Sequence, residues 1–389
     1  MFARSERNVL TKTALPRLSD FFPLIQRTMP EPFASHSTWF TMNGRNAIYY
    51  ALNLLSINKG DVVLLPSFHC TAMVDPVIAY GAQVKYYTVN RDLSLNLQEI
   101  ELHVKNGAAV VLCVHFFGFP APVEELLRIC SAYGIRLIED CTHGLFGRIG
   151  NKHMGTFGHA AIFSFRKTLP VQDGAALLLT RKQEITDMPK LKAPAIYHLR
   201  MAKWTYEKLL LANNNEGHAN RQVIESSITS STTIDGIDYH KGPDSQENPT
   251  FVTQWLNWPM SVPSKWILRR SKPELLLQRR RSNYEQLHKH LKKINKLHPC
   301  YPKLRKGVCP LGYPFIFEYR RRVDRSLRRL GIAAFSFGEI LHPSLPQKRF
   351  PDALYLSKNL TILPIHQGLS ENDIDHTGNV VAEFLGSKS

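Results

Sequence analysis

The fold is decided by residues 136–180, which read RLIEDCTHGLFGRIGNKHMGTFGHAAIFSFRKTLPVQDGAALLLT. This stretch opens with an apolar run that ends in two carboxylates, Glu139 and Asp140. A glycine-rich connection follows, and then two more apolar segments, 160–165 and 175–180, stand on either side of a turn. Short apolar runs bounded by turn residues predict buried strands, so we expect three strands here.

Two polar residues of this stretch suggest a particular chemistry. Asp140 stands at the end of the first strand, and Lys167 stands just past the end of the second. An acid in such a place can keep a pyridine nitrogen protonated, and a lone lysine can hold the same cofactor as a Schiff base. The pair therefore predicts a pyridoxal phosphate site, although a surface lysine and a helix-capping aspartate are the simpler explanations of each residue alone.

Upstream of this stretch, apolar strands alternate with helices. Strands are expected at 61–67, 83–89, 108–116 and 135–140, and helices at 68–80 and 122–133. This alternation predicts an α/β fold with a mostly parallel central sheet covered by helices. In such sheets ligands bind beyond the carboxyl ends of the strands, where Ser67, His115, Asp140 and Lys167 are all expected.

A glycine turn precedes the first predicted helix. Asn43 and Gly44 open a helix over 42–55, in which apolar residues recur at helical spacing. Free backbone N–H groups at a helix start can bind an anion, so the turn is a candidate phosphate site. An ordinary helix start remains the alternative.

The chain is long enough for more than one domain. We expect an N-terminal arm at 1–40, a large domain at 41–255 and a smaller C-terminal α+β domain at 256–389. Within the large domain, residues 213–250 are rich in Asn, Ser, Thr, Gly and Asp and predict a flexible insert.

The chain is strongly basic, with a net charge of +17 over 389 residues. This charge favours an anionic partner, such as a phosphate ester, nucleic acid or membrane surface. The run Arg279–Arg281 is most simply a solvated helix face, and the arginines at 320–329 could bind a diphosphate, a polyanion or nothing. No nucleic-acid motif accompanies them.

Six cysteines, none with CxxC spacing, suggest reduced thiols in a cytoplasmic protein, with neither a disulfide framework nor a metal site. No apolar run is long enough to span a bilayer.

The order of these motifs resembles one known family. The turn at 43–44 is followed by LPSFHCTA, VHFFG, IEDCTHG, FSFRK and DGAAL, with LPIHQGLSENDID near the end. This series is similar to that of the DegT/StrS family of pyridoxal-phosphate sugar aminotransferases. The resemblance implies a type I aminotransferase fold, a homodimer, and transfer of an amino group from glutamate to a keto group of a nucleotide-linked sugar, for polysaccharide or glycan biosynthesis.

The resemblance also implies roles for three residues around the cofactor ring. Asp140 would pair with the pyridine nitrogen, and His143 would lie near the ring hydroxyl. Lys167 would form the Schiff base and, once freed, would move the proton as a general base.

Five further residues would complete the cofactor site by the same resemblance. Gly44 and Arg45 would offer backbone N–H groups to the phosphate, and Ser164 would add a hydroxyl. Phe68 or His69 would stack against the ring.

The chain departs from the family pattern in places. Lys167 comes two residues after Phe165 instead of four, and the usual Gly-Glu-Gly-Gly is reduced to Asp173–Gly174–Ala175. The segment 197–201 only echoes the family's asparagine-containing segment, which reaches into the partner subunit. Two alternatives therefore stay open: a sugar dehydratase using the pyridoxamine form, and a non-catalytic basic binding protein.

Overall fold

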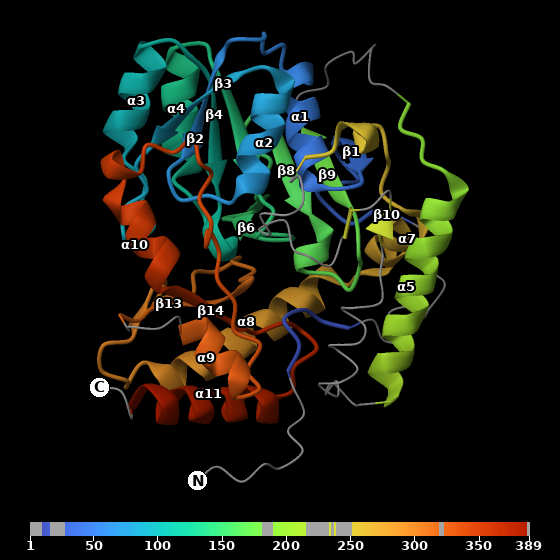
Figure 1. Cartoon of the computed structure of the whole chain (residues 1–389), viewed down its shortest axis with the longest axis vertical. Coiled ribbons are helices and arrows are strands. Elements are labelled where there is room, and N and C mark those ends of the chain that lie inside the picture. Colours follow the sequence, from blue (N-terminus) through green and yellow to red (C-terminus); the bar gives the residue numbers. More distant parts are fainter. Residues whose placement is uncertain are drawn as a thin grey trace.

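The computed structural model describes residues 10–15, 28–180, 190–214, 233–234, 237–238, 251–318 and 323–386. Its largest feature is a seven-stranded sheet with the order β1-β9-β8-β5-β4-β2-β3 (Figure 1). The strands are β1 (Ser37–Thr41), β2 (Val62–Pro66), β3 (Gln83–Tyr87), β4 (Ala108–Val114), β5 (Arg136–Asp140), β8 (Ala160–Ser164) and β9 (Ala175–Leu179).

Five neighbouring strands of this sheet, from β3 to β8, are parallel, whereas β9 and β1 run antiparallel to their neighbours. The predicted mostly parallel α/β sheet is therefore confirmed. Strand β1 was not expected, because its residues were assigned to the arm at 1–40. It pairs with β9, and Thr41 lies opposite Ala175. The two strands are about 140 residues apart in the chain, so local sequence cannot indicate this pairing.

Four helices cover this sheet: α1 (Gly44–Leu54), α2 (Thr71–Tyr80), α3 (Leu97–Lys105) and α4 (Val123–Ala132). Helix α1 packs on β8, β9 and α2, while α3 and α4 contact β4 and each other (Figure 1). Helix α3 was not predicted, because only Ile100 and Val104 of its nine residues are buried and its apolar periodicity is correspondingly weak.

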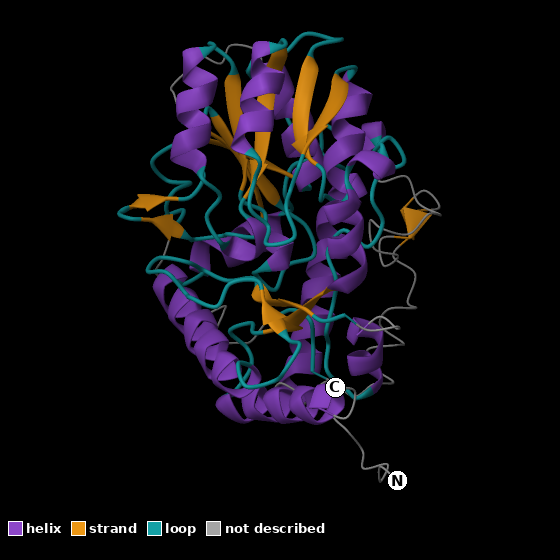
Figure 2. Cartoon of the chain, turned by 90° about the vertical axis from the view of Figure 1, so that its left-hand side faces the viewer, coloured by secondary structure: helices purple, strands orange, loops and turns teal. Residues whose placement is uncertain are grey.

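A second, antiparallel sheet follows later in the chain. It contains β12 (His298–Pro299), β13 (Gly312–Ile316) and β14 (Leu360–Pro364), and its neighbouring helices are α8 (Pro273–Leu291), α9 (Val323–Arg329), α10 (Pro351–Asn359) and α11 (Glu371–Gly386). Helices α8 and α11 pack together beneath it, and Figure 2 shows this part below the large sheet. The two sheets lie on either side of the expected domain boundary near residue 256, which itself stays a prediction.

The remaining elements are short hairpins and two helices. The hairpins are β6 (Arg148–Ile149) with β7 (Lys152–His153), and β10 (Thr233–Ile234) with β11 (Ile237–Asp238); the helices are α5 (Ala195–Asn214) and α7 (Val262–Arg270). Of the predicted insert at 213–250, residues 213 and 214 end α5 and β10 and β11 are described, while the rest lies outside the described residues. Within the described residues, no helix has the length and apolar character needed to cross a membrane.

Candidate active site

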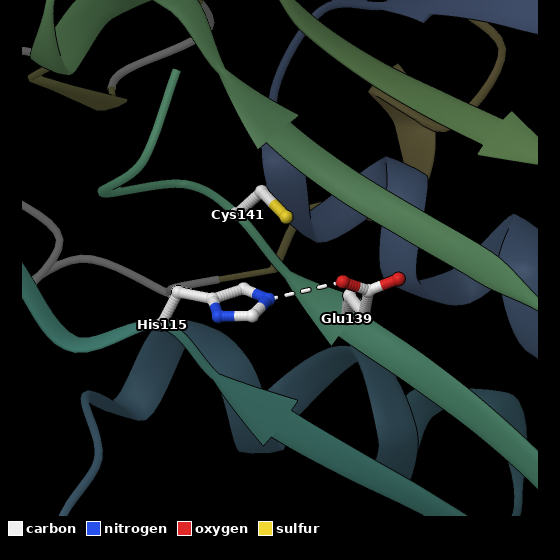
Figure 3. A group of neighbouring side chains, drawn as sticks. All are labelled: His115, Glu139 and Cys141. Atoms are coloured by element: carbon white, nitrogen blue, oxygen red, sulfur yellow. Dashed lines mark hydrogen bonds and ion pairs between the residues drawn. The ribbon is translucent and has the colours of Figure 1, made fainter. Parts of the chain in front are cut away.

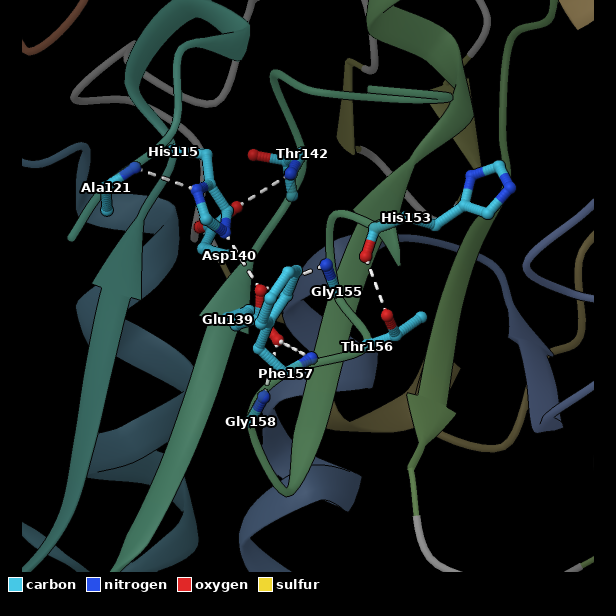
Figure 4. Close-up of polar contacts among 10 residues, drawn as sticks. All are labelled: His115, Ala121, Glu139, Asp140, Thr142, His153, Gly155, Thr156, Phe157 and Gly158. Atoms are coloured by element: carbon cyan, nitrogen blue, oxygen red, sulfur yellow. Dashed lines mark hydrogen bonds and ion pairs between the residues drawn. The ribbon is translucent and has the colours of Figure 1, made fainter. Parts of the chain in front are cut away.

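The carboxyl end of the central strand β5 carries two buried acids with different surroundings. Successive side chains of a strand point to opposite faces, which separates Glu139 from Asp140. Asp140 is 4% exposed, and its Oδ1 accepts a hydrogen bond from Thr142 N at 2.9 Å (Figure 4). Its Oδ2 accepts none from the described part of the chain. This carboxylate therefore keeps an acceptor for a ligand.

Both carboxylate oxygens of Glu139, by contrast, accept hydrogen bonds from other parts of the protein. Its two oxygens accept backbone N–H groups from Gly155, Phe157 and Gly158 at 3.0, 2.8 and 2.6 Å (Figure 4). The Oε2 atom also accepts from His115 Nε2 at 3.1 Å. Glu139 therefore holds the glycine-rich connection against the end of β5, which explains why a chain segment without regular structure can be buried there.

The same acid belongs to a group that could be mistaken for a metal centre. His115, Glu139 and Cys141 offer ligand atoms within 4.8 Å of one another (Figure 3). However, His115 Nδ1 accepts the N–H of Ala121, so Nε2 carries the ring proton and donates it to Glu139. Burial raises the pKa of the Cys141 thiol well above its usual value and keeps it protonated. His115 and Glu139 therefore suit a structural hydrogen bond, with a neutral thiol beside it, better than a metal site.

Thr142 brings the predicted acid and the predicted lysine together. Its backbone N–H binds Asp140, and its Oγ1 accepts from Lys167 Nζ at 3.2 Å. Lys167 ends a single 3-10 turn, Phe165–Lys167, in the connection between β8 and β9. The methyl group of Thr142 also faces the start of α1, since a Cβ placed on Gly44 would lie 3.8 Å from Thr142 Cγ2. Sequence analysis missed Thr142, although its place between Asp140 and His143 could have drawn attention to it.

His143 forms a wall of the same site. It is 3% exposed, its Nδ1 accepts the N–H of Phe117 at 3.3 Å, and its ring stacks on that of Phe117 with an interplanar angle of 6°. Burial, followed by the positive charges of Lys167 and Lys12, holds the pKa of His143 well below its usual value. The ring is therefore neutral, with its proton on Nε2, and it can donate a hydrogen bond to an oxygen of a ligand.

The two residues proposed to stack on a cofactor ring are engaged by the protein instead. Phe68 and His69 are both 0% exposed. The Phe68 ring packs against Phe337 at a centroid distance of 5.3 Å, and the His69 ring stacks on Tyr86 at 5.1 Å. Both ring nitrogens of His69 are hydrogen-bonded to backbone groups of the protein. Both rings are thus buried against other side chains, and a stacking role for Phe68 or His69 stays a prediction.

The remaining predicted residues lie at the edges of the site. Gly44 is the first residue of α1, where the side chain of Asn43 already accepts the N–H of Asn46. Arg45 follows it and lies close enough to Asp75 to oppose the rise in that carboxyl's pKa that burial causes. Ser164 is half-buried at the end of β8, opposite Ala175. Their contact with a phosphate stays a prediction.

Taken together, the residues around Thr142 suit pyridoxal phosphate. The site offers a buried carboxylate with an unused oxygen, a lysine amine, a neutral histidine N–H donor and a helix start. A pyridine nitrogen, an aldehyde, a ring hydroxyl and a phosphate are the four groups that such donors and acceptors complement. The fit rests on Asp140, His143, Lys167 and Gly44.

The fold is one used by aminotransferases. The structure is similar to that of Helicobacter pylori PseC, described as an aminotransferase involved in the biosynthesis of pseudoaminic acid, with a TM-score of 0.64 and 14% sequence identity. The similarity covers 98% of this chain and 100% of that one. The type I aminotransferase fold is therefore shown.

Sequence comparison then finds a similar family. The model of the DegT/DnrJ/EryC1/StrS aminotransferase family matches residues 34–215, which is just under half of the chain.

Two curated relatives match part of the chain. GDP-perosamine synthase of Vibrio cholerae is 28% identical over 139 residues, which is 35% of this chain and 38% of the relative. UDP-N-acetyl-3-dehydro-alpha-D-glucosamine 3-aminotransferase of Acidithiobacillus ferrooxidans is 28% identical over 146 residues, 37% of this chain and 40% of the relative. The chain thus matches about two fifths of the length of these relatives.

Proposed function

We propose that this protein is a pyridoxal-phosphate-dependent aminotransferase that transfers an amino group, with glutamate as donor, to a keto group of a nucleotide-linked sugar. The observation that carries the proposal is that Asp140 and Lys167 are both hydrogen-bonded to one residue, Thr142. An acid and an amine at the ends of adjacent strands, joined through a single side chain, are what such a reaction requires of the protein.

Each residue has a task that follows from its position. When bound, the cofactor supplies an electron sink. Asp140 would hold a proton on the pyridine nitrogen, and its burial strengthens that charge interaction. His143 Nε2 would donate a hydrogen bond to the ring hydroxyl. The start of α1 at Gly44 would bind the phosphate through backbone N–H groups.

Lys167 would hold the cofactor's aldehyde and afterwards move a proton as a free amine. Its Nζ already has a neutral acceptor, Thr142 Oγ1, instead of a carboxylate. This hydroxyl contact holds the amine beside the residue whose backbone binds Asp140.

The family match and the names of the relatives support the substrate class. One relative acts on a UDP-sugar that its name describes as 3-dehydro, and the other is named a GDP-perosamine synthase. We infer a keto sugar carrying a nucleoside diphosphate, used for polysaccharide or glycan biosynthesis. The net charge of +17 suits such an anionic substrate.

The alternative function, sugar dehydration, uses the same cofactor, but the dehydratases of the family lack the lysine that corresponds to Lys167. Lys167 is present and contacts Thr142, which favours amino transfer. The non-catalytic alternative relied on the basic charge of the chain, and two of its arginines are used within the protein, because Arg280 is 1% exposed and Arg281 binds the carbonyls of Arg305 and Val308.

A homodimer is part of the proposal. Helix α5 presents four apolar side chains to solvent along one stripe: Ile196, Leu199, Tyr206 and Leu210, which are 53, 64, 61 and 44% exposed. Their spacing of three, seven and four residues places them on one side of the helix. Such a stripe suits burial against a second subunit.

All six cysteines are unbonded, in keeping with a cytoplasmic protein.

The test begins with the visible spectrum of the purified protein and added pyridoxal phosphate. Borohydride reduction followed by peptide mapping should place the cofactor on Lys167, and glutamate should discharge the absorbance before reduction. Lys167→Ala should abolish trapping, whereas the control Lys152→Ala, at an exposed lysine of β7, should not. Trapping elsewhere, or none in the wild type, would refute the proposal.

A further inference from the structure

Arg280 of α8 is a buried cation at the junction between the two sheets. It is 1% exposed, and no carboxylate of the described residues lies within ion-pair distance of its guanidinium. Burial lowers its pKa, yet an arginine side chain keeps its charge in proteins. Burying a charge without a counter-ion costs free energy of desolvation, which the hydrogen bonds of the guanidinium must offset. The partners of these hydrogen bonds therefore show which parts of the chain Arg280 stabilises.

One set of these bonds reaches the turn that carries Lys167. Thr168 directly follows the lysine, and its carbonyl accepts from Arg280 Nη2 at 3.5 Å and from Gln367 Nε2 at 3.0 Å. Arg280 Nε in turn donates to Gln367 Oε1 at 2.9 Å. The Arg280 guanidinium and the Gln367 amide thus both donate to the carbonyl of Thr168, the residue next to Lys167.

A second set reaches the wall formed by His143. Arg280 Nη1 donates to the carbonyls of Pro310 and Leu311 at 3.1 and 3.0 Å. The N–H of Leu311 donates to Phe117 O at 2.8 Å, and Phe117 N binds His143 Nδ1. Arg280 therefore joins the lysine turn to the opposite side of the site through hydrogen bonds, the one to Thr168 being reinforced by Gln367.

We propose that Arg280, together with Gln367, is a positioning residue that fixes the Lys167 turn so that the amine can bond to the cofactor. This inference rests on the proposed function. Among the hydrogen bonds of the described residues, neither side chain reaches Thr142, Asp140 or Lys167 Nζ, so both act through the backbone at Thr168. The rigid fork of the guanidinium is needed for this, because a lysine ammonium cannot reach three carbonyls in one plane.

The experiment compares two ligands that differ in their use of the lysine. Pyridoxal phosphate bonds to the amine, whereas pyridoxamine phosphate fills the same site without that bond. Affinities for both are measured for wild type, Arg280→Met, Arg280→Lys and Gln367→Glu, with Arg279→Met as the control at an exposed neighbour. Gln367→Glu keeps the contact with Arg280 Nε but removes the donor to Thr168, and it serves if the Arg280 variants do not fold.

We expect Arg280→Met, Arg280→Lys and Gln367→Glu to weaken pyridoxal phosphate binding about tenfold while pyridoxamine phosphate binding stays within about twofold. Arg279→Met should change neither. Equal weakening of both ligands would mean a general structural role and would overturn the inference, as would unchanged affinities. If wild type binds pyridoxamine phosphate but never bonds pyridoxal phosphate to Lys167, the proposed function fails instead.

Discussion

Lys167 Nζ and Thr142 Oγ1 lie 3.2 Å apart, in a hydrogen bond between the β8–β9 connection and the residue two positions beyond the end of β5. Thr142 also binds the Asp140 carboxylate through its backbone, so one small residue sets the distance between the candidate acid and the candidate amine. The chemistry proposed for this site depends on that spacing.

Replacing Thr142 with valine tests the contact directly. Valine keeps the shape and the backbone bond to Asp140 but removes the hydroxyl, so Lys167 loses a neutral partner worth about 1 kcal/mol. We expect the rate of cofactor discharge by glutamate to fall about fivefold to tenfold, as measured by stopped-flow absorbance. Thr156→Val, which removes a hydroxyl bonded to the His153 carbonyl away from the lysine, is the control and should leave the rate unchanged.

Asp140→Asn tests the role of the acid. Asparagine can still accept the Thr142 N–H, so the fold should survive, but the negative charge that would hold the pyridine proton is lost. We expect pyridoxal phosphate to bind and the single-turnover rate with glutamate to fall about a hundredfold or more. A variant with wild-type turnover would exclude Asp140 as the partner of the ring nitrogen.

Glu139→Gln is predicted to act on stability. An amide –NH2 cannot accept the N–H groups of Gly155, Phe157 and Gly158 that the carboxylate oxygens accept, so donors would face donors in a buried place. We expect the free energy of unfolding to fall by about 2 to 4 kcal/mol, measured by urea denaturation. Glu124→Gln, at an exposed site in α4, should change it by less than about 0.5 kcal/mol.

The buried His69 predicts a dependence of stability on pH. Burial lowers its pKa from the ordinary 6.5 to about 4. Between these values the unfolded chain binds a proton that the folded protein does not, so the free energy of unfolding falls as the pH falls. The expected slope from this residue is about 1.4 kcal/mol per pH unit, and it vanishes above pH 6.5.

Two variants separate this contribution from that of other groups. His69→Gln should flatten the fall between pH 6.5 and 4, whatever its effect on stability at neutral pH. His376→Gln, at an exposed histidine of α11, should leave the slope as it is. If both variants keep the wild-type slope, His69 is not the group that titrates.

The exposed stripe on α5 predicts the assembly state. Leu199→Glu places a charge among apolar side chains that we expect to be buried in a dimer, so the dimer should dissociate at concentrations at which the wild type stays associated. Sedimentation velocity measures the change. Leu102→Glu changes another leucine, 57% exposed on α3, and should have no effect; equal behaviour of the two variants would argue against α5 as the interface.

By itself, the sequence determined the mostly parallel sheet, the order of its central strands along the chain, and the two residues with the strongest chemical meaning, Asp140 and Lys167. These follow from local patterns: apolar runs of strand length, turn residues between them, and polar residues at strand ends. The family resemblance added the type I fold for the same reason, since its motifs are short and contiguous.

Only the tertiary structure decided which side chains meet. Thr142 joins Asp140 to Lys167, Glu139 becomes a structural acceptor, and the rings of Phe68 and His69 are enclosed by Phe337 and Tyr86. The sequence places Arg280 among three consecutive arginines on a helix, yet the fold buries its guanidinium against backbone carbonyls from two other segments of the chain. Such contacts join residues far apart in sequence, and their geometry depends on how the two sheets pack, which no local pattern encodes.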